Sequence, residues 1–129
     1  MIKRTSKSEQ GNIGLGRAIA YFVEAGYIVS IPLNDCQKYD LIVENGGILQ
    51  RVQVKTSAFQ QNKSSWTVQL RTTSANTKAY TARPFDKTSC DLLFILTDDM
   101  SMYCIPTKQI NAVNSITVGN KYQEYRVDS

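Results

Sequence analysis

The order of apolar and polar residues divides the chain into one helical stretch followed by a series of strands. Residues 8–25 carry apolar side chains at the spacing of one broad helical face. This face is formed by Ile13, Ala18, Ile19, Ala20, Phe22 and Val23. We expect Ser6 or Ser8 to cap the start of the helix and Gly26 to end it. The pattern therefore predicts an amphipathic helix near the N-terminus.

Apolar runs of strand length follow this helix. They occupy residues 27–32, 39–44, 48–56, 64–72, 90–97 and 101–106. Residues 90–97 are the most apolar run and predict a central strand, with residues 101–106 returning beside it. Residues 107–113 predict one or two helical turns, and the last residues predict an edge strand or a tail. This order predicts an α+β fold, an α/β sandwich with a mixed β-sheet, in a single domain over residues 1–129.

A glycine pair joins two of these strands and sets the direction of their side chains. If Gly46 and Gly47 form a two-residue turn, Asp40 lies directly opposite Gln53. If the turn is Asn45-Gly46, Asp40 faces Arg51 and Gln53 lies one diagonal step away. In both cases the acid and the amide share a face, because side-chain direction alternates along a strand. A three-residue turn would break this relation.

The shared face gathers polar groups, and the opposite face gathers apolar ones. Asp40, Gln53 and Lys55 lie together on the polar face, with Glu44 and Arg51 farther along. The apolar face carries Leu41, Val43, Val52 and Val54. An acid, an oxygen ligand and a lysine suit metal-assisted phosphodiester cleavage, since Mg²⁺ prefers oxygen ligands and a lysine offsets negative charge. The alternative is an exposed polar face with one cross-strand ion pair.

Composition narrows the chemistry. The chain has 129 residues and no histidine, which excludes Ser-His-Asp and Cys-His nucleophiles and most catalytic zinc sites. The cysteines Cys36, Cys90 and Cys104 form no CxxC pair, and we expect them to fill buried or half-buried positions. The chain has no long apolar run and no apolar stretch behind its charged N-terminal segment, so we expect an intracellular protein without a membrane span.

A net charge of +4 and a pI near 9.0 are compatible with a polyanionic partner. Basic residues cluster at the N-terminus and recur, among aromatic residues, in a long polar segment over residues 73–89. The candidate nucleic-acid contacts are Lys3, Arg4, Lys7, Arg71, Lys78, Tyr80, Arg83 and Lys87. Gly11, Gly14 and Gly16 each cost up to about 1 kcal/mol inside the predicted helix. We expect another helix or a nucleic-acid phosphate to approach the backbone there.

Residues 9–57 resemble the PD-(D/E)XK nuclease superfamily, through a glycine-containing first helix, a strand ending in Pro32, and the runs "YDLIV" and "RVQVKT". The later run "CDLLFILTDDMSMYCIP" is similar to the strand pair that follows in that family. The resemblance is nearest to archaeal Holliday-junction resolvases and to a branch of group I intron homing endonucleases. It implies a mixed β-sheet flanked by helices and a Mg²⁺-dependent DNA endonuclease, with Mn²⁺ as a substitute ion.

The resemblance also implies roles for individual residues. Asp40 would bind the metal, Gln53 occupies the second acidic position of the family, and Lys55 is its lysine; the Val54 carbonyl is a common extra ligand. Two positions depart from the pattern. Gln53 brings no charge, which is similar to the homing-endonuclease branch, and Leu15 stands where many relatives have a glutamate. Glu9 is a further candidate acid near the helix start.

The first hypothesis is a homing-type, site-specific DNA endonuclease that acts on double-stranded or branched DNA in a DNA-associated, cytoplasmic setting. A small domain sees only part of a long site, so we expect a homodimer or homotetramer. A junction resolvase is the next subtype and a restriction-type enzyme the third. The other hypotheses are a DNA-binding module that has lost efficient catalysis and a structural protein without salt-dependent DNA binding.

Overall fold

The structure is a computed structural model, and it describes residue 2 and residues 5–34, 38–73 and 82–128. Its first element is the helix α1 (Lys7–Glu24), which confirms the predicted helix. The Ser6 Oγ atom accepts a hydrogen bond from the Glu9 amide, so Ser6 is the cap of the two candidates. Gly26, with φ +90°, follows the last turn in a left-handed conformation that glycine adopts without strain.

The glycines of α1 differ in what surrounds them. A Cβ atom at Gly14 would lie 2.5 Å from Thr56 Cγ2 and 3.3 Å from Val54 Cγ1, both on a strand of the main sheet. The close approach at Gly14 therefore comes from the main sheet, whereas the sequence had suggested another helix or a nucleic-acid phosphate. Among the described residues, nothing lies within 4 Å of a Cβ atom built at Gly11 or Gly16.

This difference predicts opposite effects of two matched substitutions. Gly16→Ala is expected to raise the free energy of unfolding by about 0.5–1 kcal/mol, because alanine loses less backbone entropy in a helix. Gly14→Ala has the same helical gain but is expected to lower stability, because overpacking typically costs about 1–3 kcal/mol and the branched Thr56 side chain is stiff. Urea unfolding of both variants tests this, and equal stabilisation by the two would contradict the packing of α1 on the sheet.

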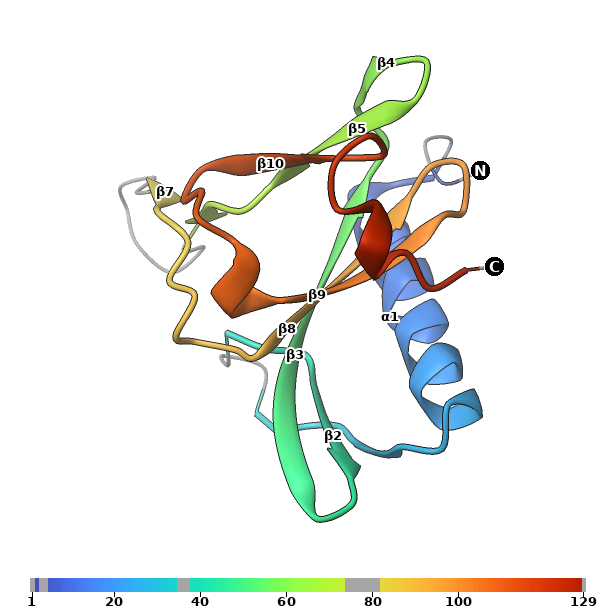
Figure 1. The fold of residues 1–129 in the computed structure, drawn as a ribbon, viewed down its shortest axis with the longest axis vertical. Helices are drawn as coiled ribbons and strands as arrows, with labels where there is room; N and C mark the ends of the chain where they lie inside the picture. The colour runs from blue at the N-terminus through green and yellow to red at the C-terminus, as the bar shows by residue number, and fades with distance from the viewer. Residues whose placement is uncertain (1, 3–4, 35–37, 74–81, 129) are drawn as a thin grey trace.

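The main sheet has five strands in the order β1-β2-β3-β8-β9 (Figure 1). The strands are β1 (Ile28–Ser30), β2 (Leu41–Asn45), β3 (Ile48–Ser57), β8 (Leu92–Thr97) and β9 (Met102–Pro106). β3 pairs with β8 in parallel, and the other neighbours are antiparallel, so the sheet is mixed as predicted. β8 is entirely buried, which agrees with its prediction as a central strand.

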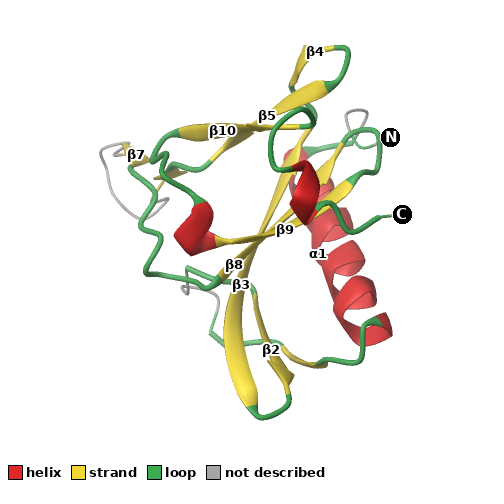
Figure 2. Ribbon diagram, in the orientation of Figure 1, coloured by secondary structure: helices red, strands yellow, loops and turns green. Residues whose placement is uncertain are grey.

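Two cores lie on opposite faces of this sheet. On one face α1 packs through Ala18 and Phe22 against a cluster that includes Val43, Val52 and Phe94. On the other face lies a second core, which includes Leu93 and Ile95. That face is covered by a three-stranded sheet, whereas α1 covers the first face (Figure 2).

The second sheet has the order β10-β5-β4, with strands β4 (Gln60–Asn62), β5 (Ser65–Gln69) and β10 (Ser115–Val118). Trp66 and Val68 of β5 point into the second core, as their alternation predicts. The short strands β6 (Thr72–Thr73) and β7 (Ala82–Arg83) pair with each other. The helical turns η1 (Thr107–Gln109) and η2 (Gln123–Tyr125) complete the described elements. Of the one or two turns predicted over residues 107–113, the structure has the single short turn η1.

Candidate active site

The β2–β3 hairpin adopts the two-residue turn. Gly46 and Gly47 have φ values of +60° and +81°, which suit a turn that matches the twist of the strands. Asn45 pairs with Ile48 and Leu41 pairs with Val52, so the next position along the register sets Asp40 opposite Gln53. Of the two registers considered from the sequence, the Gly46-Gly47 turn is the correct one.

The pairing of β3 with its other neighbour fixes the face on which the polar residues lie. In the parallel ladder Gln53 is beside Leu93 and Lys55 is beside Ile95, and both partners belong to the second core. Gln53 and Lys55 therefore lie on the face of the main sheet opposite α1. Leu15 packs instead in the core beneath α1, so an apolar contact accounts for this departure from the family pattern.

Asp40 is held directly before the start of β2. Its backbone N–H donates to the Val52 carbonyl at 2.7 Å, and its Oδ2 atom accepts from the Val54 N–H at 2.7 Å. Because β2 begins only at Leu41, the Val54 amide lies beyond the paired part of the hairpin, and the Asp40 carboxylate takes the place of a strand partner. This bond sets the carboxylate against the backbone of β3 between Gln53 and Lys55.

Lys55 is half-buried, and its environment changes its charge state. Burial lowers the pKa of the Lys55 amine from its ordinary value, and the nearby Asp40 carboxylate acts in the opposite direction. Cys90, which is buried, also lies close enough to influence this amine. A partly desolvated lysine beside a carboxylate is an arrangement typical of reactive sites, although ion pairs that only stabilise a fold show it too.

The oxygen donors at this position suit a hard divalent cation. A carboxylate has about four lone-pair directions, and the Val54 amide uses one of those of Asp40. The Gln53 side-chain amide and the Val54 carbonyl are neutral oxygen donors of the kind that Mg²⁺ accepts. Within the described ranges, no group of three or more His, Cys, Asp and Glu side chains is placed to hold a metal ion. An ion here would rely on one carboxylate, on neutral oxygens, and on water or substrate for its remaining ligands.

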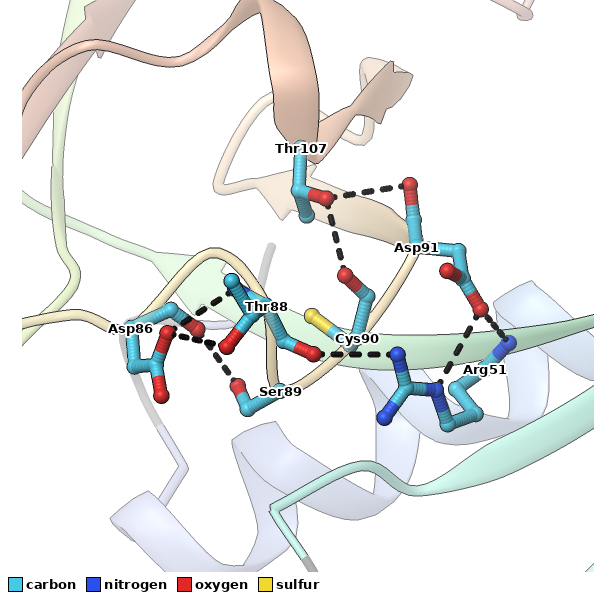
Figure 3. Close-up of polar contacts among 7 residues, drawn as sticks. All are labelled: Arg51, Asp86, Thr88, Ser89, Cys90, Asp91 and Thr107. Carbon is cyan, nitrogen blue, oxygen red and sulfur yellow. Dashed lines mark hydrogen bonds and ion pairs between the residues drawn. The ribbon is translucent and has the colours of Figure 1, made fainter.

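A polar cluster surrounds Arg51, which precedes Gln53 by two positions on β3 (Figure 3). Arg51 Nε lies 3.3 Å from Asp91 Oδ2, and Arg51 Nη2 donates to the Thr88 carbonyl at 3.0 Å. Thr88 in turn donates to Asp86 Oδ1 through its amide at 2.9 Å and its hydroxyl at 2.6 Å. Burial alone would raise the pKa of Asp91, but the hydrogen bonds and charge of Arg51 lower it below its usual range. The sequence predicted that Arg51 shares a face with Asp40 and Gln53, but it did not indicate Asp91 as its partner.

The remaining site candidates fall into separate places. Glu9 is exposed in the first turn of α1, where it accepts a hydrogen bond from Ser6 Oγ at 3.0 Å. That contact belongs to the helix cap. Lys7 lines an open hollow of about 550 Å³ with Thr67 and Gln69 of β5.

The basic candidates are only partly within the described residues. Arg71 directly precedes β6, and Arg83 pairs with Thr72 across the short hairpin, so these two lie near each other. Lys87 is exposed in the connection to β8. The candidates Lys3, Arg4, Lys78 and Tyr80 lie outside the described residues.

The cysteines behave as expected for packed thiols where they are described. Cys90 and Cys104 are free, and Cys90 is buried. Burial raises the pKa of both thiols, to about 12 for Cys104. Cys36 lies outside the described residues. In the part of the chain that the structure describes, no helix is long and apolar enough to cross a membrane.

Comparisons with known proteins agree with this geometry. A family model described as PD-(D/E)XK endonuclease matches residues 5–127. The bacterial homing endonuclease I-Ssp6803I has a similar solved structure, with a TM-score of 0.78 and 26% sequence identity over 95% of this chain and 89% of that chain. No curated protein matches the chain. With a mixed sheet, a hairpin that sets Asp40 opposite Gln53, and a family match over nearly its whole length, the chain belongs to the PD-(D/E)XK endonuclease family.

Proposed function

We propose that this protein is a Mg²⁺-dependent DNA endonuclease of the site-specific homing type, with its catalytic site at Asp40, Gln53 and Lys55. The observation that carries the proposal is the half-buried Lys55 amine, with its lowered pKa, beside a carboxylate fixed by the Val54 amide. The likeness to I-Ssp6803I, a homing endonuclease, supports the subtype. Mn²⁺ is expected to substitute for Mg²⁺.

Each residue has a separate task in this proposal. Asp40 and the oxygens of Gln53 and Val54 hold the cation, which supplies positive charge and Lewis acidity at the phosphate when it is bound. Lys55 orients the attacking water and offsets the charge that develops on the phosphate oxygens. The water oxygen forms a bond to phosphorus and gives up a proton to solvent, the bond to the leaving oxygen breaks, and that oxygen takes up a proton. Glu9 remains a weaker candidate, because its observed contact caps α1.

DNA contact is proposed for the basic candidates that the sequence singles out. Lys7, Arg71, Arg83 and Lys87 would bind phosphates, as would Lys3, Arg4 and Lys78, with Tyr80 packing on a base or sugar. One copy carries one such site, so cutting both strands of a duplex requires a homodimer or homotetramer. Exposed apolar side chains at Ile28 and Leu33, on and beside the edge strand β1, favour contact between copies.

Two alternatives share the same fold. A Holliday-junction resolvase would use the same chemistry on branched DNA. A DNA-binding module with weakened catalysis is favoured by Gln53 in an acidic position and by Leu15, which packs in the core where relatives have a glutamate.

One experiment distinguishes the homing endonuclease from the resolvase and the DNA-binding module. The protein is incubated with a plasmid library that carries randomised inserts, and with a synthetic four-way junction, in Mg²⁺ or in EDTA. Mg²⁺-dependent cutting of a small set of related inserts is the expected result. Cutting of the junction alone would select the resolvase, and salt-sensitive binding to both substrates without cutting of either would select the binding module.

A further inference from the structure

Two segments meet at the side chain of Arg51: the connection before β8 and the residues before β2. Its guanidinium group contacts Asp91 Oδ2 at 3.3 Å and the Thr88 carbonyl at 3.0 Å. Its Cζ atom lies 5.9 Å from the ring centroid of Tyr39. Figure 3 shows Arg51 reaching from β3 to the connection that precedes β8. The arginine therefore ties β3 both to the start of β8 and to the residue before Asp40.

Two hydrogen bonds that involve the backbone reinforce the contact between Arg51 and Asp91. The Arg51 N–H donates to Asp91 Oδ2 at 2.8 Å, and the Asp91 N–H donates to the Arg51 carbonyl at 2.8 Å. The parallel pairing of β3 with β8 starts at the next position, Val52 with Leu92. These bonds join β3, which carries Gln53 and Lys55, to the residue directly before β8, and so hold the two strands in this register.

The contact with Tyr39 bears directly on the candidate metal ligand. Asp40 is outside the paired part of β2 and is held by its bonds to Val52 and Val54. Tyr39 precedes it and is held by the face of its ring against Arg51, an arrangement that attracts a cation. Without Arg51, the chain entering Asp40 would lose this third restraint.

The energies of such contacts indicate that Arg51 affects the positions of its neighbours more than the stability of the fold. The Arg51 and Asp91 side chains are 40% and 41% exposed, and ion pairs at such sites contribute about 0–1 kcal/mol. Removing the guanidinium group should therefore leave the fold intact and change local geometry.

We propose that Arg51 is a positioning residue: by holding Tyr39, Asp91 and Thr88 together, it keeps the Asp40 carboxylate on the Val54 amide and so sets the candidate metal site. The role of Arg51 in catalysis rests on the proposed function. Its role in placing Asp40 does not rest on that function, and it is measured without metal or DNA.

The test is hydrogen exchange of the Val54 amide, whose partner is Asp40 Oδ2. Arg51→Met is expected to speed this exchange about tenfold, while the Ile95 amide in β8 reports any change in global stability. Asp40→Ala shows the exchange of an unpartnered Val54 amide. Arg126→Met is the matched control, because Arg126 Nε and Nη2 pair with Asp128 at 2.9 and 3.0 Å beside β9.

Unchanged Val54 exchange in Arg51→Met, or an equal rise in Arg126→Met, would overturn the proposal. If Arg51→Met does not fold, Asp91→Asn removes the charge of the partner at nearly constant shape and is expected to speed the same exchange. In the cleavage assay, Arg51→Met should raise the Mg²⁺ concentration for half-maximal cutting about tenfold, with a smaller change in maximal rate. A wild type that never cuts would contradict the proposed function and leave the exchange result standing.

Discussion

Lys55→Met is expected to abolish most DNA cleavage and to leave the protein at least as stable as the wild type at pH 7. Loss of one group that stabilises transition-state charge typically costs about 10²–10³-fold in rate. The fold does not depend on the amine, because burial works against its charged form. Methionine keeps an unbranched chain of similar length beside Ile95 and removes that cost. The measurement is the cleavage rate together with the melting temperature.

The direction of the pH dependence follows from the lowered pKa of Lys55. Between the folded pKa and the ordinary value of 10.5, the unfolded chain binds a proton that the folded chain does not. Stability then rises with pH across this window, and the cost of the buried charge is present in full below it. The advantage of Lys55→Met should therefore be largest near pH 7 and shrink as pH approaches 10.5.

The control for this variant is Lys121→Met, which removes the same charge from an exposed position. It is expected to leave the cleavage rate close to that of the wild type. A Lys55→Met protein that unfolds at pH 7, or that cuts at the wild-type rate, would show that the lysine is a structural residue.

Asp40→Asn is expected to reduce Mg²⁺-dependent cleavage at least about 100-fold, since even outer partners of metal ligands contribute about 10–100-fold. The asparagine oxygen can still accept from the Val54 N–H, so the hairpin should keep its geometry while the site loses its carboxylate. Half-maximal cutting should need more Mg²⁺, and Mn²⁺ should restore part of the rate. A metal titration of the cleavage rate measures all three effects.

Glu24→Gln is the matched control for Asp40→Asn, because it removes one exposed carboxylate at the end of α1, on the opposite face of the sheet. It is expected to cut at the wild-type rate with an unchanged Mg²⁺ requirement. If Asp40→Asn cuts at the wild-type rate, the metal binds elsewhere. If the wild-type protein binds DNA fully but does not cut it, the binding module is favoured.

Local patterns were sufficient to predict the parts of the fold that place the site. The helix and the apolar strands each depend on residues close in sequence, and the glycine pair predicted a two-residue turn but left two registers open. Because side-chain direction alternates along a strand, either register determined that Asp40 and Gln53 share a face. The family resemblance is confirmed by the match over residues 5–127, and the catalytic roles stay predictions.

Contacts between distant segments could not be predicted in this way. Arg51 and Asp91 are 40 positions apart, and nothing local marks either as the partner of the other. The close approach at Gly14 depends on how α1 crosses β3, and the sequence suggested another helix or a nucleic-acid phosphate as the neighbour where the structure has Thr56. The strand β4 could not be predicted from apolar alternation, because its three residues are all polar and exposed.

The catalytic role of the hairpin is tested by nicking of the preferred plasmid substrate with wild type and Lys55→Met, side by side, in Mg²⁺ and in EDTA. We expect nicking by the wild type in Mg²⁺ alone, and a rate lower by about 10²–10³-fold in the variant at equal melting temperature. Nicking that persists in EDTA, or that the two proteins share, would contradict the assignment of this hairpin as the catalytic site.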